Sequence, residues 1–388
     1  MKASITSVDV DGKRTLVRED LNVPFADGAI SDDARIKAAI PTLEHLADRG
    51  AKVIVMSHLG RPKGVDPSLS LKPVATALAK LLGREVQFAD DCVGQAASSA
   101  VGRLQAGQVL LLENVRFHPE DEANDPDFAS RLASLGELFV NDAFAASHRA
   151  HASVVGVAKY LPAYAGELMI AELTALHKAL DDPKRPLVAV VGGAKVSTKA
   201  GVLRHLLAKV DALLIGGAMA NTFFKAKGYP TGKGLVEDSA LDDAKKVMKE
   251  GGKKLVLPVD LVCAQKMEAG QPLKTMPADA VEPGWMALDI GPKSVAEFAK
   301  RIASASTIVW NGPMGVAEIP EFSEGTRGVG EAMAGSGAYT LVGGGDTVAA
   351  IDSLGLSRRF SHVSTGGGAT LEYLEGKELP GVAILKDA

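Results

Sequence analysis

The chain has 388 residues, of which 46% are hydrophobic and 23% charged, and this ordinary globular balance excludes a largely disordered protein. The formal net charge of -4 provides no overall positive field that would hold nucleic acid or an anionic membrane, so we expect neither as a partner. The length predicts about two or three domains.

Cysteine content and apolar runs indicate the compartment. The only cysteines, Cys92 and Cys263, lie far apart without metal-like spacing, which is typical of a reducing environment. The first ten residues lack the apolar core of a signal peptide, and no uninterrupted apolar stretch is long enough to span a bilayer. We therefore expect a soluble, cytoplasmic protein.

The first half of the chain alternates between strand and helix patterns. In chain order we predict a strand at 13–18, a helix from Asp32 or Asp33 to Gly50 with a kink at Pro41, a strand at 52–57, a helix at 72–82, a strand at 85–88, a helix at 93–104, and strands at 108–112 and 137–140. A long polar loop with two histidines, 141–151, follows the last strand and is a candidate for a binding site.

The second half repeats this plan after a helix at 165–180 and a charged stretch, 181–186, that contains two prolines. We predict strands at 187–191, 212–215, 254–257, 307–310, 338–342 and 361–363, and helices at 197–208, 218–227, 239–250, 294–302 and 369–375. The strands are apolar nearly throughout, which favours parallel sheets covered on both faces by helices. Ligands then bind beyond the carboxyl ends of the strands.

The polar residues near the strand ends of the first half are mainly arginines and histidines. They are Arg18, Arg35 at a helix start, His58, Arg61, Arg116, His148, Arg149 and His151. Each arginine alone is more often a solvated charge or an ion-pair partner, but several that converge repel one another unless an anion lies among them. Asp20 and Asn22 suit a substrate hydroxyl. These residues predict a small, strongly anionic, hydroxylated ligand, whereas His45, His177 and His205 are interpreted as ordinary helix residues.

The second half instead offers glycine-rich turns. In the stretch 339–352 an apolar run breaks at the glycines 343–345, and a helix-compatible segment begins there, which is typical of a phosphate site as well as of a plain tight turn. Asp346 and Thr347 add an acceptor and a hydroxyl. Lys195 and Lys199 are predicted to share one face of a helix start. Glu318 could hold ribose hydroxyls, although a surface carboxylate is the simpler interpretation.

Two other functions remain open on these residues alone. The sheet type would also suit a nicotinamide-dependent dehydrogenase, but the glycine fingerprint of dinucleotide enzymes is absent, as is the phosphate-binding loop of common nucleotide hydrolases. A module that binds a phosphorylated ligand without catalysis is the second alternative.

Seven motifs in order along the chain resemble those of phosphoglycerate kinases. They are Val17-Arg-Glu-Asp-Leu-Asn-Val-Pro24, Ser57-His-Leu-Gly-Arg-Pro62, Leu112-Glu-Asn-Val-Arg-Phe117, Asn141-Asp-Ala-Phe144 with His148-Arg-Ala-His151, Val191-Gly-Gly-Ala-Lys-Val196 onward to Lys199, Trp310-Asn-Gly-Pro313 and Gly343-Gly-Gly-Asp-Thr347. The resemblance implies an α/β fold of two Rossmann-like domains, each with a mainly parallel sheet flanked by helices, joined by a hinge.

The resemblance also implies the activity: reversible transfer of the acyl phosphate of 1,3-bisphosphoglycerate to Mg²⁺-bound ADP, giving ATP and 3-phosphoglycerate, by a monomer. The implied 3-phosphoglycerate site comprises Asp20, Leu21, Asn22, Arg35, His58, Leu59, Gly60, Arg61, Arg116 and Arg149. The implied nucleotide site comprises Lys195, Lys199, Glu318, Gly344, Gly345, Asp346 and Thr347, with Asp346 near the metal. Arg35, Lys195, Gly367 and Gly368 resemble the groups around the transferred phosphoryl.

The implied domains are 1–165 for phosphoglycerate, 166–186 as an interdomain helix and hinge, 187–375 for nucleotide, and a tail, 376–388, that returns to the N-terminal domain. Two residues depart from the family pattern. Glu19 replaces a commonly apolar residue and is expected to point away from the ligand by strand alternation, and Ala317 replaces a commonly aromatic one beside Glu318.

Overall fold

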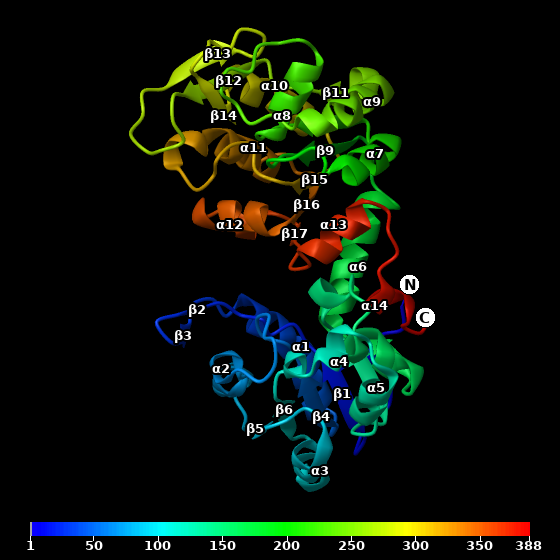
Figure 1. Cartoon of the computed structure of the whole chain (residues 1–388). Coiled ribbons are helices and arrows are strands. Elements are labelled where there is room, and N and C mark those ends of the chain that lie inside the picture. Colours follow the sequence, from blue (N-terminus) through cyan, green and yellow to red (C-terminus); the bar gives the residue numbers. More distant parts are fainter. Residues whose placement is uncertain (1) are drawn as a thin grey trace. The chain divides into compact units, whose positions relative to one another are not determined.

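The computed structural model describes residues 2–388 and divides the chain into two compact units (Figure 1). The first unit comprises the chain up to Leu173 together with Glu378–Ala388, and the second comprises Thr174–Lys377. The division in sequence falls within helix α6 (Glu167–Leu180). Among the described helices, none combines the length and the apolar character needed to cross a membrane.

The first unit is built on a six-stranded parallel sheet in the order β5-β6-β4-β1-β7-β8. Its strands are β1 (Arg14–Arg18), β4 (Lys52–Met56), β5 (Val86–Ala89), β6 (Val109–Leu112), β7 (Leu138–Asn141) and β8 (Ala163–Ala165). Five of them confirm the predicted strands, and β8 is an addition. Strands β1, β4, β6 and β7 are buried on both faces along nearly their whole length, as their apolar runs predicted.

Helices cover both faces of this sheet, and in Figure 1 the strands lie between α2 on the left and α5 on the right. The helices of the unit are α1 (Ala34–Asp48), α2 (Lys72–Leu82), α3 (Gly94–Arg103), α4 (Pro119–Glu122), α5 (Pro126–Ala133) and α14 (Pro380–Ala383). Helix α1 continues through Pro41, and of its two predicted caps it is Asp32 whose Oδ1 accepts the Ala34 N–H, at 2.9 Å. A small hairpin, β2 (Phe25–Ala26) and β3 (Ala29–Ile30), precedes it.

The end of the chain packs on the first unit. The Asn141 side-chain amide donates to the Gly381 carbonyl at 2.8 Å, and the Gly381 N–H donates to the Ser147 carbonyl at 2.8 Å. A Cβ at Gly381 would lie only 2.8 Å from Ser147 Cα, so this close approach needs glycine. The loop 141–151 is therefore largely a buried connection rather than an open polar loop: Asn141, Asp142 and Ser147 have no exposed surface.

The second unit repeats the plan with a parallel sheet in the order β11-β10-β9-β15-β16-β17. Its strands are β9 (Leu187–Val191), β10 (Ala212–Ile215), β11 (Leu255–Val256), β15 (Thr307–Asn311), β16 (Tyr339–Gly343) and β17 (His362–Val363). Each confirms a predicted strand. The first strand of each unit, β1 or β9, lies in the interior of its sheet with later strands on both sides. Ligands bind at the carboxyl ends of the strands, where the strand order reverses.

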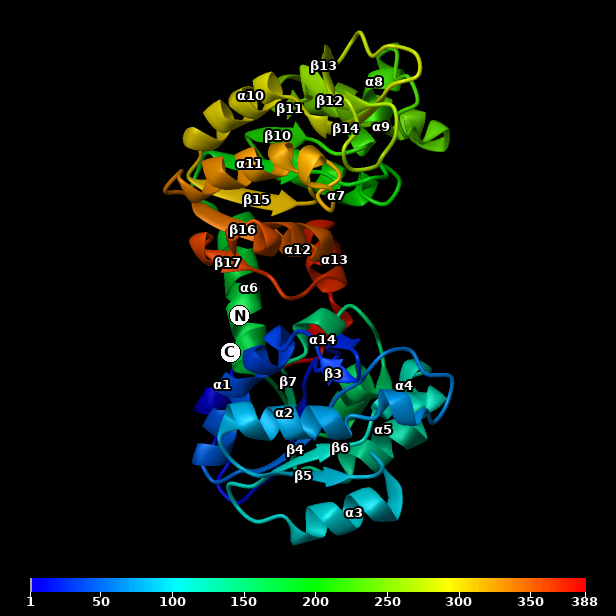
Figure 2. The same cartoon turned by 90° about the vertical axis from the view of Figure 1, so that its left-hand side faces the viewer.

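The second unit also contains an antiparallel sheet that the sequence did not predict. Its strands β12 (Asp260–Ala264), β13 (Lys274–Pro277) and β14 (Met286–Ile290) lie together at the upper right of Figure 2, apart from β15 and β16. The helices of the unit are α7 (Ala200–Lys209), α8 (Met219–Ala226), α9 (Leu241–Gly251), α10 (Pro292–Ala303), α11 (Glu324–Ala334), α12 (Gly345–Ser353) and α13 (Gly368–Leu374).

Asp289 on β14 is a buried acid with an unusual protonation equilibrium. Its Oδ1 accepts the Ile290 N–H at 2.8 Å and its Oδ2 accepts the Gly325 N–H at 2.6 Å. Burial nevertheless raises the pKa of Asp289 from 3.8 to about 7, and the two N–H groups offset only part of this effect. The folded protein thus holds a proton here that the unfolded chain releases.

We expect Asp289 to make the second unit less stable as the pH rises from about 4 to 7. The folded pKa lies above the unfolded value, so the stability is full below the unfolded pKa and is lost as pH rises through the folded pKa, with a slope of up to about 1.4 kcal/mol per pH unit. Both tryptophans, Trp285 and Trp310, lie in this unit, so urea unfolding followed by tryptophan fluorescence reports on it.

Asp289→Asn should flatten this part of the pH dependence, because an amide cannot ionise. Asp279→Asn is the matched control, since Asp279 is an exposed acid of the same unit. Equal pH slopes for wild type and Asp289→Asn would show that the carboxyl is ionised in the folded protein.

Candidate active site

A chain of hydrogen bonds connects the carboxyl ends of three strands in the first unit. Arg35, in the first turn of α1, donates to Asp20 Oδ2 at 2.6 Å. Asp20 Oδ1 accepts the Asn22 N–H at 3.1 Å, and Asn22 Oδ1 accepts the Gly60 N–H at 2.8 Å. Arg116 Nη1 donates to the Gly60 carbonyl at 2.7 Å. Five of the predicted substrate residues, from loops after β1, β4 and β6 and from α1, are thereby brought together.

His58 lies close enough to four of the predicted arginines for their charges to act on it. Burial lowers the pKa of His58 well below its usual range, and Arg18, Arg116, Arg35 and Arg149 lower it further. Its Nδ1 lies 3.1 Å from Arg18 Nη2. Because a guanidinium can only donate, Nδ1 must accept, and the neutral ring then carries its proton on Nε2. His58 is therefore a neutral hydrogen-bond donor among cations.

Arg18, which contacts His58, is held in place by buried hydrogen bonds. It is fully buried, donates through Nε to Ser153 Oγ at 3.1 Å, and donates through Nη1 to the Glu19 carbonyl. The Glu19 side chain is itself fully buried, and neither of its carboxylate oxygens has a hydrogen-bond partner among residues 2–388. Burial, with Asp142 as a nearby acid, raises the pKa of Glu19 well above its usual range. The orientation of Glu19 away from a ligand stays a prediction.

The other predicted residues of this site contribute in different ways. Leu21 and Leu59 have buried side chains and are held through their backbones: the Leu21 N–H donates to Ser57 Oγ at 2.9 Å and the Leu59 N–H to Asn114 Oδ1 at 3.2 Å. Arg149 is half-buried, and its Nε lies 3.1 Å from His148 Nε2. Arg61 is exposed on the turn after β4.

Asn114 is a positioning residue that the sequence did not single out. Its Oδ1 accepts the N–H groups of Leu59 and Arg116, and its Nδ2 donates to the carbonyls of Leu59 and Leu69, at 2.8 and 2.9 Å. One fully buried amide thus joins the turn after β4 to the turn after β6. Its position two residues after the buried strand β6 is the feature of the sequence that could have identified it.

In the second unit, Lys199, in the loop between β9 and α7, is connected to the ends of two strands. Lys199 Nζ contacts Asn311 Oδ1 at the end of β15, and Asn311 Nδ2 donates to the Gly343 carbonyl at the end of β16, at 2.9 Å. The pKa of Lys199 is lowered by burial, although the nearby Asp346 opposes this. Gly344 has a φ of 94°, and a Cβ there would lie 2.7 Å from Asn311 Nδ2. This turn therefore requires glycine.

The predicted shared helix face of Lys195 and Lys199 is wrong. Helix α7 begins at Ala200 rather than at Ser197, so Lys199 precedes the helix and Lys195 lies in the loop before it. Glu237 explains the delay, because its carboxylate accepts hydrogen bonds from both the N–H, at 2.9 Å, and the hydroxyl of Ser197. Side-chain bonds of this kind compete with helical ones. Glu237 was missed because it lies 40 residues further along the chain.

Glu318 and Asp346 line one cavity of about 430 Å³. Ala317, Ala349, Ala350 and Leu354 form part of its apolar wall. Thr347, next to Asp346, accepts the Gly312 N–H through Oγ1 at 2.6 Å and so fixes the first turn of α12, which begins at Gly345. Asp346 is exposed in that turn. The exposed Asp346 carboxylate beside this cavity suits Mg²⁺. Mg²⁺ is usually bound by one or two carboxylates together with phosphate oxygens and water.

Gly367 and Gly368 lie apart from this cavity wall, at the start of α13. Gly367 has a φ of 50° immediately before the helix.

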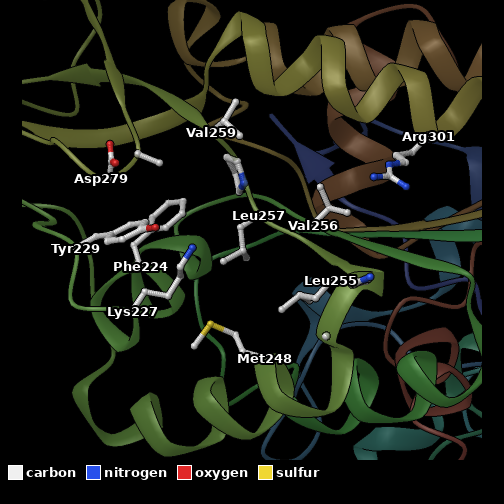
Figure 3. A pocket seen from close by; sticks show the side chains of 14 residues that line it. Phe224, Lys227, Tyr229, Met248, Leu255, Val256, Leu257, Val259, Asp279 and Arg301 are labelled. Carbon is white, nitrogen blue, oxygen red and sulfur yellow. The ribbon is translucent and has the colours of Figure 1, made fainter.

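A larger cavity of about 570 Å³ borders the edge strand β11, and none of the predicted site residues lines it (Figure 3). Its polar side includes Lys227, whose Nζ lies 4.5 Å from the centre of the Tyr229 ring.

Comparisons with known proteins agree with one another. The model of the family described as phosphoglycerate kinase matches residues 5–377. A phosphoglycerate kinase of Moorella thermoacetica is 53% identical over 390 residues, covering 100% of this chain and 99% of that protein. One of Synechococcus elongatus is 53% identical over 395 residues, covering 100% of this chain and 98% of that protein. The solved structure of phosphoglycerate kinase from Coxiella burnetii has a TM-score of 0.92 and 45% identity, covering 99% of this chain and 98% of that one.

Proposed function

Because the chain belongs to the phosphoglycerate kinase family, we propose that its first unit binds the phosphoglycerate and its second unit binds the nucleotide. The chain is a glycolytic kinase with a carboxyl group as phosphate acceptor. It transfers the acyl phosphate of 1,3-bisphosphoglycerate reversibly to ADP, giving ATP and 3-phosphoglycerate. The functional domain limits, including a hinge at 166–186, belong to this proposal, as do the monomeric state and the cytoplasmic location.

The observation that carries the proposed substrate site is the hydrogen-bonded series from Arg35 through Asp20, Asn22 and Gly60 to Arg116. It leaves guanidinium groups and a neutral imidazole donor, His58, at the carboxyl ends of neighbouring strands. Guanidinium forks match phosphate and carboxylate oxygens. We assign the phosphate and carboxylate of 3-phosphoglycerate to these arginines, with Arg61 and Arg149 as further partners, and its hydroxyl to Asp20 and Asn22.

For the nucleotide, we assign the phosphates to Lys195, Lys199 and the N–H groups of the turn from Gly344 to Thr347. The Glu318 carboxylate would accept hydrogen bonds from ribose hydroxyls, since it lines the same cavity as Asp346. Asp346 would hold Mg²⁺, which neutralises part of the phosphate charge when it is bound.

The reaction needs cations rather than a general base. In the direction of ATP consumption the nucleophile is the carboxylate of 3-phosphoglycerate, which is already ionised at neutral pH. During transfer, negative charge spreads over the equatorial oxygens of the moving phosphoryl group. We propose that Arg35 and Lys195 stabilise this charge, together with the N–H groups at Gly367 and Gly368.

A coupled assay of ATP formation from 1,3-bisphosphoglycerate and magnesium ADP tests the function. We expect turnover that depends on both substrates. Binding of phosphoglycerate without ATP formation would instead indicate a non-catalytic binding module. A change in the absorbance of NADH on mixing with the protein alone would instead indicate a nicotinamide-binding dehydrogenase.

A further inference from the structure

Asp91, Cys92 and His118 form a cluster in the first unit that the proposed function does not use. Asp91 and Cys92 follow the carboxyl end of β5, and His118 follows the turn after β6. One ligating atom from each residue, a carboxylate oxygen, the thiol sulfur and an imidazole nitrogen, lies within 4.8 Å of the other two. His118 Nε2 and Asp91 Oδ1 are 2.8 Å apart.

The donor set suits a borderline-soft divalent cation. Thiolate, imidazole and carboxylate are the ligands of protein-bound Zn²⁺, at about 2.0 to 2.3 Å from the metal. At tetrahedral angles these bond lengths separate the ligand atoms by roughly 3.3 to 3.6 Å. The three ligand atoms lie within 4.8 Å of one another, so shifts of about an ångström bring them to these separations, and the imidazole and carboxylate part by about half an ångström.

Cys92 does not have the surroundings of a reactive cysteine. Cys92 has no exposed surface, and burial raises the pKa of its thiol well above its usual range, with Asp91 and Asp121 adding to the effect. A nucleophilic cysteine requires the opposite shift. Asp91 and His118 are partly exposed and provide an entry path, and the His118 ring packs 5.2 Å from the Phe128 ring, which restricts its orientation.

We propose that Asp91, Cys92 and His118 bind a divalent cation of the Zn²⁺ type, with water as the fourth ligand. Binding forms a metal–sulfur bond, breaks the S–H bond and releases one proton to solvent, so affinity rises with pH. One carboxylate and one thiolate balance the two positive charges of the metal. The cation would connect the loop after β5 to the turn after β6. These two strands pair directly in the sheet.

Titration of the full-length protein with Co²⁺ tests the site, because thiolate bound to Co²⁺ gives a charge-transfer absorption band in the near ultraviolet. We expect a band that saturates at one equivalent and is removed by competing Zn²⁺. Cys263→Ser is the matched control, since the chain has only these two cysteines and Cys263 is also buried. This variant should keep the band, and Cys92→Ser should lose it.

Further variants keep the test decisive if Cys92→Ser fails to fold. His118→Gln and Asp91→Asn retain the thiol, and each should weaken Co²⁺ binding by at least about tenfold. Circular dichroism establishes that each variant is folded. Absence of the band in wild type, an equal band in folded Cys92→Ser, or unchanged affinity in both His118→Gln and Asp91→Asn would overturn the proposal.

Discussion

Lys195→Ala should lower turnover by about 10²- to 10³-fold while changing the KM for each substrate only a few-fold. Loss of one charge-stabilising donor in a transfer reaction typically costs about 3 to 4 kcal/mol. The Lys195 side chain is exposed, so its ammonium group is accessible to a ligand. The hydrogen bonds between Ser197 and Glu237 hold the backbone of its loop in place. An interaction made only in the transition state appears in kcat rather than in KM.

Steady-state kinetics of ATP formation over a full range of both substrates measures this effect. Lys246→Ala, which removes another exposed lysine of the second unit on α9, should leave both constants near their wild-type values. Near-normal turnover in Lys195→Ala, or a loss confined to KM, would mean that Lys195 does not stabilise the transferred group.

Arg35→Ala should lower turnover to a similar extent. Arg35 donates to Asp20 at 2.6 Å, yet 39% of its side chain remains exposed, so donors remain available to a ligand. Asp20 is only 9% exposed, and the variant leaves its carboxylate without this cation. Arg35→Lys retains the charge but loses the planar fork, and we expect it to recover only part of the rate.

Lys37→Ala is the matched control for Arg35, because Lys37 lies on the same helix and pairs with Asp33 at 2.7 Å. It should turn over at the wild-type rate. Thermal unfolding of Arg35→Ala separates the cost of the unpaired Asp20 from a catalytic effect. A folded Arg35→Ala enzyme with near-normal turnover would remove Arg35 from the transfer step.

The parallel sheets could be predicted from the sequence because their strands carry a local signal. Val53, Ile54 and Val55 on β4 are fully buried, and such an apolar run followed by Gly or Pro is readable without knowledge of any partner. The same holds for Arg18 and Arg116, because they lie at or soon after the carboxyl ends of β1 and β6, and such ends meet at one edge of a parallel sheet.

The antiparallel sheet lacked that signal. Most of β13 (Lys274–Pro277) is exposed, so its residues resemble a loop, whereas β14 buries an acid, Asp289. Helix α11 was missed because glycines disfavour helices. Here they are required by packing: a Cβ at Gly325 would lie 2.2 Å from Asp289 Oδ1, and one at Gly330 would lie 2.8 Å from Leu356. Such constraints come from residues distant in sequence.

At the candidate site, the start of α7 could not be predicted from the local sequence either. The local pattern from Ser197 onward favours a helix, but Glu237 binds Ser197 and delays the helix to Ala200. Contacts across 40 residues are not encoded in local periodicity. The departure at Glu19 is similar, since its complete burial next to Asp142 depends on the packing of β1 against β7.

Isothermal titration of two variants with two ligands tests most directly whether the arginine cluster and the glycine turns are separate sites. Arg116→Ala should weaken binding of 3-phosphoglycerate by about tenfold or more and leave magnesium ADP unaffected, because a hydrogen bond to a charged group contributes about 1.5 to 3 kcal/mol. Lys199→Ala should do the reverse. If each variant weakened both ligands equally, or neither, the assignment of one ligand to each unit would be contradicted.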